Sequence, residues 1–213
     1  MSGPEPGTTP TPQTPPPAAP PPPSDWAAAS APPPAAAVPG HAGLVYADVP
    51  NRIIAQIIDA IIVGIVLIVI GAILGSILGA PMTLTGTEIS YNYVSLLISA
   101  VVGTAISAAY YIYTWTRMRG TIGQRLLGMQ VGNAADGATL TMEQAVKRWL
   151  ALGGVFALAQ LLQPLPALGL LLSLAGLVWA IALLVTTAQS PTKQGLHDQF
   201  AGSVVVKAVR TVG

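Results

Sequence analysis

One apolar stretch, residues 53–80, constrains this sequence more than any other feature, because Asp59 is its only charged residue. An α-helix rises 1.5 Å per residue and needs roughly 20 apolar residues to cross a bilayer, so this stretch is long enough to span. The whole chain is 52% hydrophobic and only 8% charged. The sequence therefore predicts a protein that folds around helices in lipid.

Further apolar segments follow. Residues 92–116 form the second and end in the aromatic cluster YYIYTW, which is typical of a membrane interface. A single helix over the apolar run 149–187 would be about 58 Å long, far more than a hydrocarbon core of about 30 Å. The prolines of QPLP, residues 163–166, are the expected break. We therefore predict an all-α polytopic membrane protein with four helical segments, about 53–80, 92–116, 145–163 and 167–188.

The basic residues predict the topology. All nine Lys and Arg lie at Arg52, within residues 117–148, or from Lys193 onward, whereas the first connection between helices carries only Glu88. Under the positive-inside rule these basic regions share the cytoplasmic side. We expect two helical hairpins in the cell membrane, with both chain termini cytoplasmic. The alternative has residues 149–163 lying in the interface, which leaves open whether that segment fully spans the bilayer.

The N-terminal region has a different composition. Residues 1–50 contain 16 of the 20 prolines and no Lys or Arg. Such a segment cannot bury enough apolar surface to offset the entropy of ordering. We predict a disordered Pro/Ala-rich tail over residues 1–49, acting as a spacer or as a proline-rich docking segment, and a transmembrane domain over residues 50–207.

The polar segment between the second and third helices has local signals of its own. Asp136-Gly137 is a turn signal, and TMEQ at residues 141–144 fits a capping box that opens a helix. Near the C-terminus, SVVVKAV is typical of a short strand that can pair with GMQV at residues 128–131. We expect a small cytoplasmic β patch of two or three strands.

Arg52, Gln56 and Asp59 fall on one face of the first helix and form a polar stripe. An ionised carboxylate within the hydrocarbon costs several kcal/mol, so Asp59 should face other helices, pair with a cation or take up a proton. We expect a cation to neutralise it. The candidates are Arg52, Arg125, Lys147 and Arg148.

Small residues recur every four positions on the first two helices. Gly71, Gly75 and Gly79 form one ridge, and Ser95, Ser99, Gly103 and Ser107 form another. Such ridges let helix backbones approach closely. We interpret them as helix-packing positions, with a dimer face as the alternative.

Three sequence blocks resemble the RDD family of small integral membrane proteins, which is named for one arginine and two aspartates. The blocks are RIIAQIIDAII, RGTIGQRLLGMQVGNAADG and QGLHDQFAGSVVV, in the family's order over roughly residues 50–207. The resemblance implies that Arg52, Asp59 and Asp198 are the signature residues. Gln124 replaces a frequent lysine and Ser203 a usual threonine. For this family, transport of unspecified ligands is the suggested activity.

Two roles remain open for this charge constellation. Asp198 either fixes the C-terminal segment by pairing with Arg52 or Arg125, or belongs to an ion or proton path with Asp59. His197 titrates near neutral pH and could tune either arrangement. A basic cluster is expected to contact anionic headgroups: Arg117, Arg119, Arg125, Lys147 and Arg148.

Composition limits the function. The chain has no Cys and only two His, so we expect neither a metal site nor a cofactor, and its net charge of +1 argues against a nucleic-acid partner. We also expect no enzyme, because G-x-S-x-G and H-E-x-x-H are absent. Two hypotheses remain: a membrane protein that moves an ion, proton or small solute, as a possible homo-oligomer, or a structural membrane protein that binds a partner.

Overall fold

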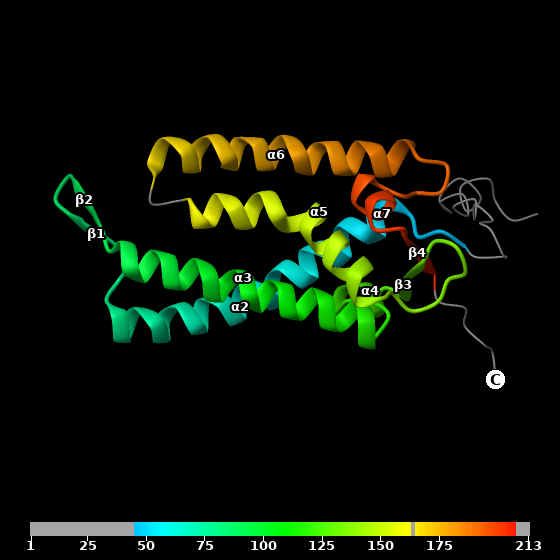
Figure 1. Ribbon diagram of the computed structural model, residues 1–213, viewed down its shortest axis with the longest axis horizontal. Helices are drawn as coiled ribbons and strands as arrows, with labels where there is room; N and C mark the ends of the chain where they lie inside the picture. Colours follow the sequence, from blue (N-terminus) through cyan, green and yellow to red (C-terminus); the bar gives the residue numbers. More distant parts are fainter. Residues whose placement is uncertain (1–44, 163–164, 208–213) are drawn as a thin grey trace, which may run out of the picture. The chain divides into compact units, whose positions relative to one another are not determined.

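The computed structural model describes residues 45–162 and 165–207. Most of the predicted tail and the first two residues of QPLP lie outside the described residues. In chain order the elements are α2 (Val49–Leu78), β1 (Met82–Thr85), β2 (Glu88–Tyr91), α3 (Tyr93–Arg117), α4 (Ile122–Leu126), β3 (Met129–Asn133), α5 (Met142–Leu161), α6 (Pro166–Gln189), α7 (Leu196–Phe200) and β4 (Ser203–Lys207) (Figure 1).

A long helix occupies each predicted stretch, but within the described residues three helices are long and apolar enough to cross a membrane. These are α2, α3 and residues 167–189 of α6. The first two turns of α5 carry Glu143, Lys147 and Arg148. Its remaining apolar part, residues 149–161, is about 20 Å long, which is less than a hydrocarbon core of about 30 Å. Length and composition therefore support three spans.

Local chemistry sets the helix ends. α2 begins four residues before the predicted start because Pro50 lies in its first turn, where a proline's fixed φ favours the helix. The capping box predicted for α5 is present: Thr141 Oγ1 accepts from the Gln144 backbone N–H at 3.2 Å, and Gln144 Oε1 accepts from the Thr141 N–H at 3.1 Å. α6 begins at Pro166, which agrees with the predicted break.

The connection between α2 and α3 is a β-hairpin, which the sequence reading missed. Its strands pair antiparallel from Met82↔Tyr91 to Thr85↔Glu88. Gly86, with φ of 65°, lies in the turn, where a positive φ favours glycine. The alternation of apolar and polar residues around the glycine in MTLTGTEIS is the signal that would have identified the hairpin.

The long helices form two hairpins. α3 packs against α2 and α5, and α5 packs against α6, whereas α2 and α6 touch only marginally. Figure 1 shows β1 and β2 at the same end of the helices as the end of α5 and the start of α6. α4, α7, β3 and β4 lie together at the opposite end of the helices (Figure 1). The basic segments of the described chain are therefore gathered at one end.

The predicted β patch is present at that end. β3 and β4 pair antiparallel from Met129↔Lys207 to Asn133↔Ser203, and Tyr46 adds an isolated bridge to Val206. The sheet belongs to the main hydrophobic core, whose buried members are Ala47, Ala55, Tyr111, Trp115, Met129, Val131, Leu140, Ala145 and Val205.

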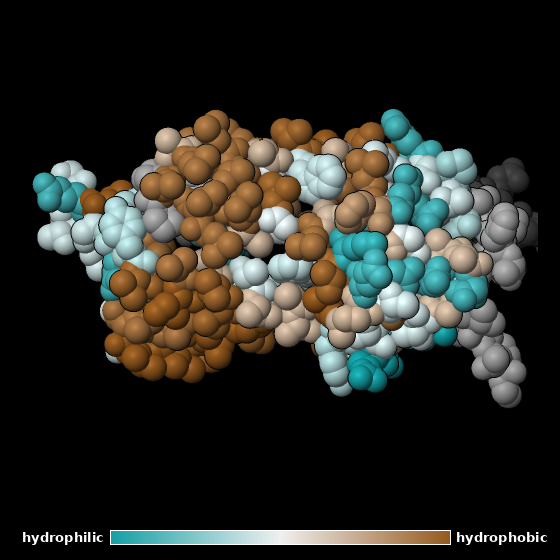
Figure 2. Space-filling view, in the orientation of Figure 1, coloured by the Kyte–Doolittle hydropathy of each residue, from teal (hydrophilic) through white to brown (hydrophobic). Residues whose placement is uncertain are grey.

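The long helices leave most of their apolar side chains exposed. In the most apolar 18-residue windows of α2, α3 and α6, only 11%, 11% and 17% of the residues are buried. Figure 2 shows this surface as a brown region over the helices and a hydrophilic region over the α4, α7 and β3–β4 end. An apolar surface of this extent belongs in lipid rather than in water.

Candidate functional site

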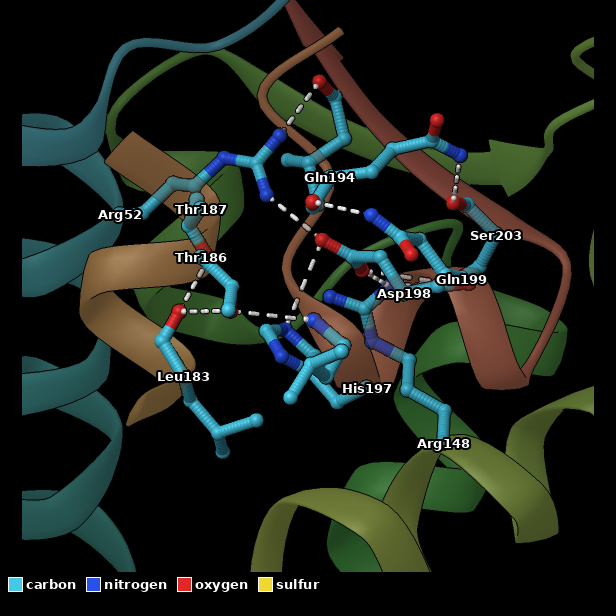
Figure 3. A network of polar contacts seen from close by, with 12 residues as sticks. Arg52, Arg148, Leu183, Thr186, Thr187, Gln194, His197, Asp198, Gln199 and Ser203 are labelled. Atoms are coloured by element: carbon cyan, nitrogen blue, oxygen red, sulfur yellow. Dashed lines mark hydrogen bonds and ion pairs between the residues drawn. The ribbon is translucent and has the colours of Figure 1, made fainter. Parts of the chain in front are cut away.

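The two aspartates that the sequence resemblance singled out, Asp59 and Asp198, occupy different sites, and Asp198 lies at the centre of the first. Its carboxylate is fully buried. Arg52 Nη1 of α2 donates to Oδ2 at 2.8 Å, and Arg148 Nη1 of α5 donates to Oδ1 (Figure 3). The ion pair expected between Asp198 and Arg52 is therefore present. Together these three residues, which we call the clasp, join the start of α2, the start of α5 and α7.

Neighbouring groups fix both guanidinium groups. Ser203 Oγ accepts from Arg148 Nη1 at 2.6 Å and donates to Asp198 Oδ1 at 3.2 Å. Arg52 donates to the carbonyl oxygens of Ala47 and Val205, each at 3.2 Å. The Arg148 guanidinium carbon also lies 4.9 Å from the centroid of the Trp115 ring, a cation–π distance.

The clasp carries an excess positive charge. Burial on its own raises the pKa of Asp198, but the nearby Arg148 and Arg52 outweigh it and hold that pKa well below its usual range. Burial, with repulsion from the two arginines, lowers the pKa of His197 to about 4, although Asp198 opposes this effect. His197 is therefore neutral at pH 7. Two arginines then share one carboxylate, which leaves a charge of about +1.

Asp59 lies in the second site and is bound by neutral donors. Tyr110 donates its hydroxyl to Oδ1 at 2.6 Å, the Gly123 backbone N–H donates to Oδ1 at 2.8 Å, and Thr121 Oγ1 donates to Oδ2. The residue is only 1% exposed. Among the ion pairs of the described residues, none includes Asp59. The prediction that a cation neutralises this carboxylate is therefore wrong.

Asp59 has hydrogen-bond donors in place of a cation because of the position of α4. Thr121 caps α4 through a capping box with Gln124, which turns the free N–H of Gly123 toward α2. Gly123 approaches α2 so closely that a Cβ there would overlap the carbonyl oxygen of Ala55. Charge-assisted hydrogen bonds from these donors replace the expected cation.

Sequence reasoning missed Tyr110, Thr121 and Gly123. The signal for the last two was TIGQ at residues 121–124, which has the same pattern as the recognised capping box TMEQ. No local pattern indicated Tyr110, because its hydroxyl meets Asp59 across 51 positions of sequence.

The other basic candidates do not reach either aspartate. Arg125 is exposed and forms no ion pair with the described residues. Lys147 pairs with Glu143 at 2.5 Å on the surface of α5. Gln56, the middle residue of the predicted stripe, donates to the Tyr111 hydroxyl at 2.9 Å. The stripe therefore exists, but each of its members has a separate partner.

The small-residue ridges differ in their packing. No described atom lies within 4 Å of a Cβ built on Gly71 or Gly75, so the interpretation of these two as packing positions is wrong within one chain. Gly79 and Ser95 do meet, because Ser95 Oγ donates to the Gly79 carbonyl at 2.8 Å. In the second ridge, Leu67 lies 3.6 Å from the Cβ position of Gly103.

Trp149 Nε1 lies 3.4 Å from Ser107 Oγ, which places Ser107 of the same ridge beside α5. Ser99 also belongs to this ridge, and its hydroxyl forms no hydrogen bond with the described residues.

A cavity of about 640 Å³ lies between α2, α3, α5 and α6. Arg52, Gln56, Arg148 and His197 contribute to its wall, together with many apolar residues of the four helices. Of the described residues that line it, none is an aspartate or a glutamate. The charged groups that reach this space are therefore the two arginines of the clasp, and both signature carboxylates lie outside its wall.

The described residues were also considered as ligands for a metal ion. In residues 45–162 and 165–207, no group of three or more His, Asp or Glu side chains is placed to hold a metal ion.

Comparison with known proteins agrees with the sequence resemblance. The model of the RDD family matches residues 46–202, a range that contains Arg52, Asp59 and Asp198. Neither the curated proteins nor the solved structures gave a match. The family match covers well over half of the chain, and together with the apolar helices it identifies a membrane protein. The chain belongs to the RDD family.

Proposed function

We propose that this protein binds a small solute in the cavity between its long helices and takes part in moving it across the membrane. The main support for this proposal is the cavity itself, which has a volume of about 640 Å³ and has Arg52 and Arg148 in its wall. Ligand sites in proteins have about 300–1,000 Å³ and combine an apolar lining with a few placed polar groups. In this proposal the clasp orients the two guanidinium groups, and neither aspartate contacts the solute.

The geometry favours this cavity over a path between the two aspartates. Asp59 and Asp198 are each saturated by hydrogen-bond donors and fully or almost fully buried. A carboxylate that carries a proton or an ion must be accessible to that proton or ion, and these two carboxylates are buried. The cavity wall, in contrast, offers polar groups beside open space. The ion, proton or solute is therefore expected to pass by way of the cavity.

Filling the cavity tests this proposal. The only described atom within 4 Å of a Cβ built on Gly153 is Trp149 Nε1, at 4.0 Å, so Gly153→Leu projects into open space in the cavity wall. Gly71→Leu is the matched control, because Gly71 lies on α2 outside the cavity and has open space around it. Both variants gain similar helix propensity.

The assay uses proteoliposomes with trapped pH and sodium indicators and with a mixture of small solutes measured by mass spectrometry. We expect wild type and Gly71→Leu to pass one species and Gly153→Leu to lose most of that flux. Equal flux in all three proteins, or none above empty liposomes, would count against transport through this cavity.

A structural role is the second candidate, and the clasp favours it. The Arg52–Asp198 ion pair joins residues 146 positions apart and ties the start of α2 to the C-terminal segment. In this alternative the cytoplasmic face or the N-terminal tail binds a partner. The role predicts that Asp198→Asn lowers the folded yield, and that deleting residues 1–45 changes which proteins co-purify with the chain. Unchanged yield and unchanged partners would oppose it.

For topology we propose two hairpins in the cell membrane, with both termini on the cytoplasmic side. Support comes from the basic residues, which gather at the α4, α7 and β3–β4 end, and from the positive-inside rule. This arrangement needs a fourth crossing by α5 in addition to the three helices that are long and apolar enough to span. We propose that its contacts with α3 and α6 carry this shorter helix through the membrane. Because the chain has no Cys, single cysteines at Glu88 and Gly137 can be labelled from either side. Labelling of both from the same side would refute the α2–α3 hairpin.

We further propose that the protein is not an enzyme, works without a cofactor, contacts anionic headgroups through its basic end and forms a homo-oligomer. Exposed Arg117, Arg125 and Lys147 support the headgroup contact. Arg148, which was expected to join them, is instead buried against Asp198. Light scattering of the protein in detergent, corrected for bound detergent, tests the oligomeric state.

A further inference from the structure

The cavity has one polar end and a largely apolar remainder. Arg52, Gln56, Arg148 and His197 line the polar end, next to the clasp. Val63, Leu67, Leu152 and Phe156 are among the apolar side chains along the rest of the wall. A ligand that satisfies both parts has a polar head and an apolar body.

The charge at the polar end selects the sign of that head. Arg52 and Arg148 share the single carboxylate of Asp198, which lies outside the cavity wall, and no described carboxylate lines the cavity. In a low-dielectric site, an uncompensated positive charge favours an anion.

Unsatisfied donors support the same conclusion. Among the described residues, Arg148 Nε, Trp115 Nε1, Thr104 Oγ1 and His197 Nδ1 are buried without a hydrogen-bond partner, and all four residues line the cavity. Arg148 Nε and Trp115 Nε1 carry hydrogens and can only donate. Because no acceptor compensates them, these two N–H dipoles add to the positive potential beside the cavity.

The cavity also opens toward lipid. Lining residues Ile57 of α2 and Leu184 of α6 are 54% and 46% exposed, and these two helices make little contact with each other. A ligand with an apolar tail can therefore enter sideways from the bilayer.

We propose, building on the proposed solute cavity, that its ligand is a single-chain amphipathic anion drawn from the membrane, with its anionic head beside Arg52 and Arg148 and its tail between α2 and α6. A fatty-acid carboxylate is the simplest member of this class.

The test uses the full chain in nanodiscs of zwitterionic lipid and a dibromo fatty acid, whose bromines quench tryptophan fluorescence on contact. Trp115 and Trp149 line the cavity and report occupancy. The methyl ester of the same acid is the matched neutral ligand. At pH 7.5 we expect saturable quenching by the acid, with an apparent affinity at least tenfold higher than that of the ester.

Three variants separate the role of the head from that of the cavity. Gly153→Leu should abolish the saturable quenching and Gly71→Leu should leave it unchanged. Gln56→Glu places a carboxylate beside the excess positive charge, while the Tyr111 hydroxyl can donate to the new side chain. We expect this variant to weaken acid binding at least tenfold and ester binding much less, because the ester head carries no charge.

Each outcome decides a different point. If the acid and the ester bind equally and Gly153→Leu blocks both, the preference for an anion is refuted. The proposal that the cavity binds a solute is then still supported. Quenching that Gly153→Leu does not alter would remove both proposals. A soluble anion such as phosphate that protects the tryptophans as well as the fatty acid does would refute the need for a tail.

Discussion

Replacing Asp198 by asparagine tests the organisation of the clasp. The side chain is fully buried and accepts from Arg52, Arg148 and Ser203. Asparagine keeps one acceptor oxygen but places an amide N–H₂ donor against one of the two guanidinium groups. It also removes the single negative charge that the two arginines share.

The magnitude follows from burial. Arg148 is 3% exposed and Arg52 11% exposed, so neither guanidinium can be rehydrated without opening the fold. Removing one partner of a buried ion pair costs about 3–5 kcal/mol. At about 1.4 kcal/mol per factor of ten, the folding equilibrium should fall roughly 100- to 5,000-fold.

The assay is unfolding by SDS in mixed micelles of a neutral detergent, followed by tryptophan fluorescence and circular dichroism. Trp115 lies against Arg148 and reports the clasp directly. Glu143→Gln is the control, because it removes the exposed pair with Lys147 and should leave the unfolding midpoint unchanged.

A double variant completes the test. Arg148→Met in the Asp198→Asn background removes the orphaned charge and should restore at least half of the lost free energy of unfolding. The reasoning is refuted if Asp198→Asn is within about 1 kcal/mol of wild type, or if the double variant is no more stable than the single one.

Three further predictions concern the same two sites. The pKa of His197 is about 4 in the fold and about 6.5 when unfolded, so the unfolded chain binds more protons between these values. The free energy of unfolding should therefore fall by up to about 3 kcal/mol as pH drops from 6.5 to 4, and His197→Gln should flatten this curve in denaturant titrations. Asp59→Asn should cost only about 1–2 kcal/mol by SDS unfolding, because the hydroxyl donors around Asp59 can turn and accept; a loss as large as that of Asp198→Asn would contradict this. Gly123→Ala should lower the thermal midpoint because its Cβ meets the Ala55 carbonyl, whereas Gly71→Ala should hold or raise it. Equal midpoints for the two alanine variants would show that α4 does not approach α2 this closely.

Features governed by neighbouring residues were predictable. The apolar stretches located α2, α3 and α6, because lipid demands a continuous run of apolar residues that hydrogen-bond within their own helix. The capping box at Thr141 and the break before Pro166 were predictable for the same local reason. Strand pairing between GMQV and SVVVK followed from their composition.

The partners of the charged residues were decided only by the tertiary structure. Asp59 lies seven residues from Arg52, yet Arg52 pairs with Asp198, 146 positions away, because α7 folds back against the start of α2 and α5. Asp59 is instead bound by Tyr110, Thr121 and Gly123, which the approach of α4 to α2 brings within reach. Sequence alone determined which segments enter lipid, because that depends on the transfer free energy of each segment. Which donor meets which carboxylate depends on how the packed helices and the returning chain bring distant atoms together, and no local pattern encodes that.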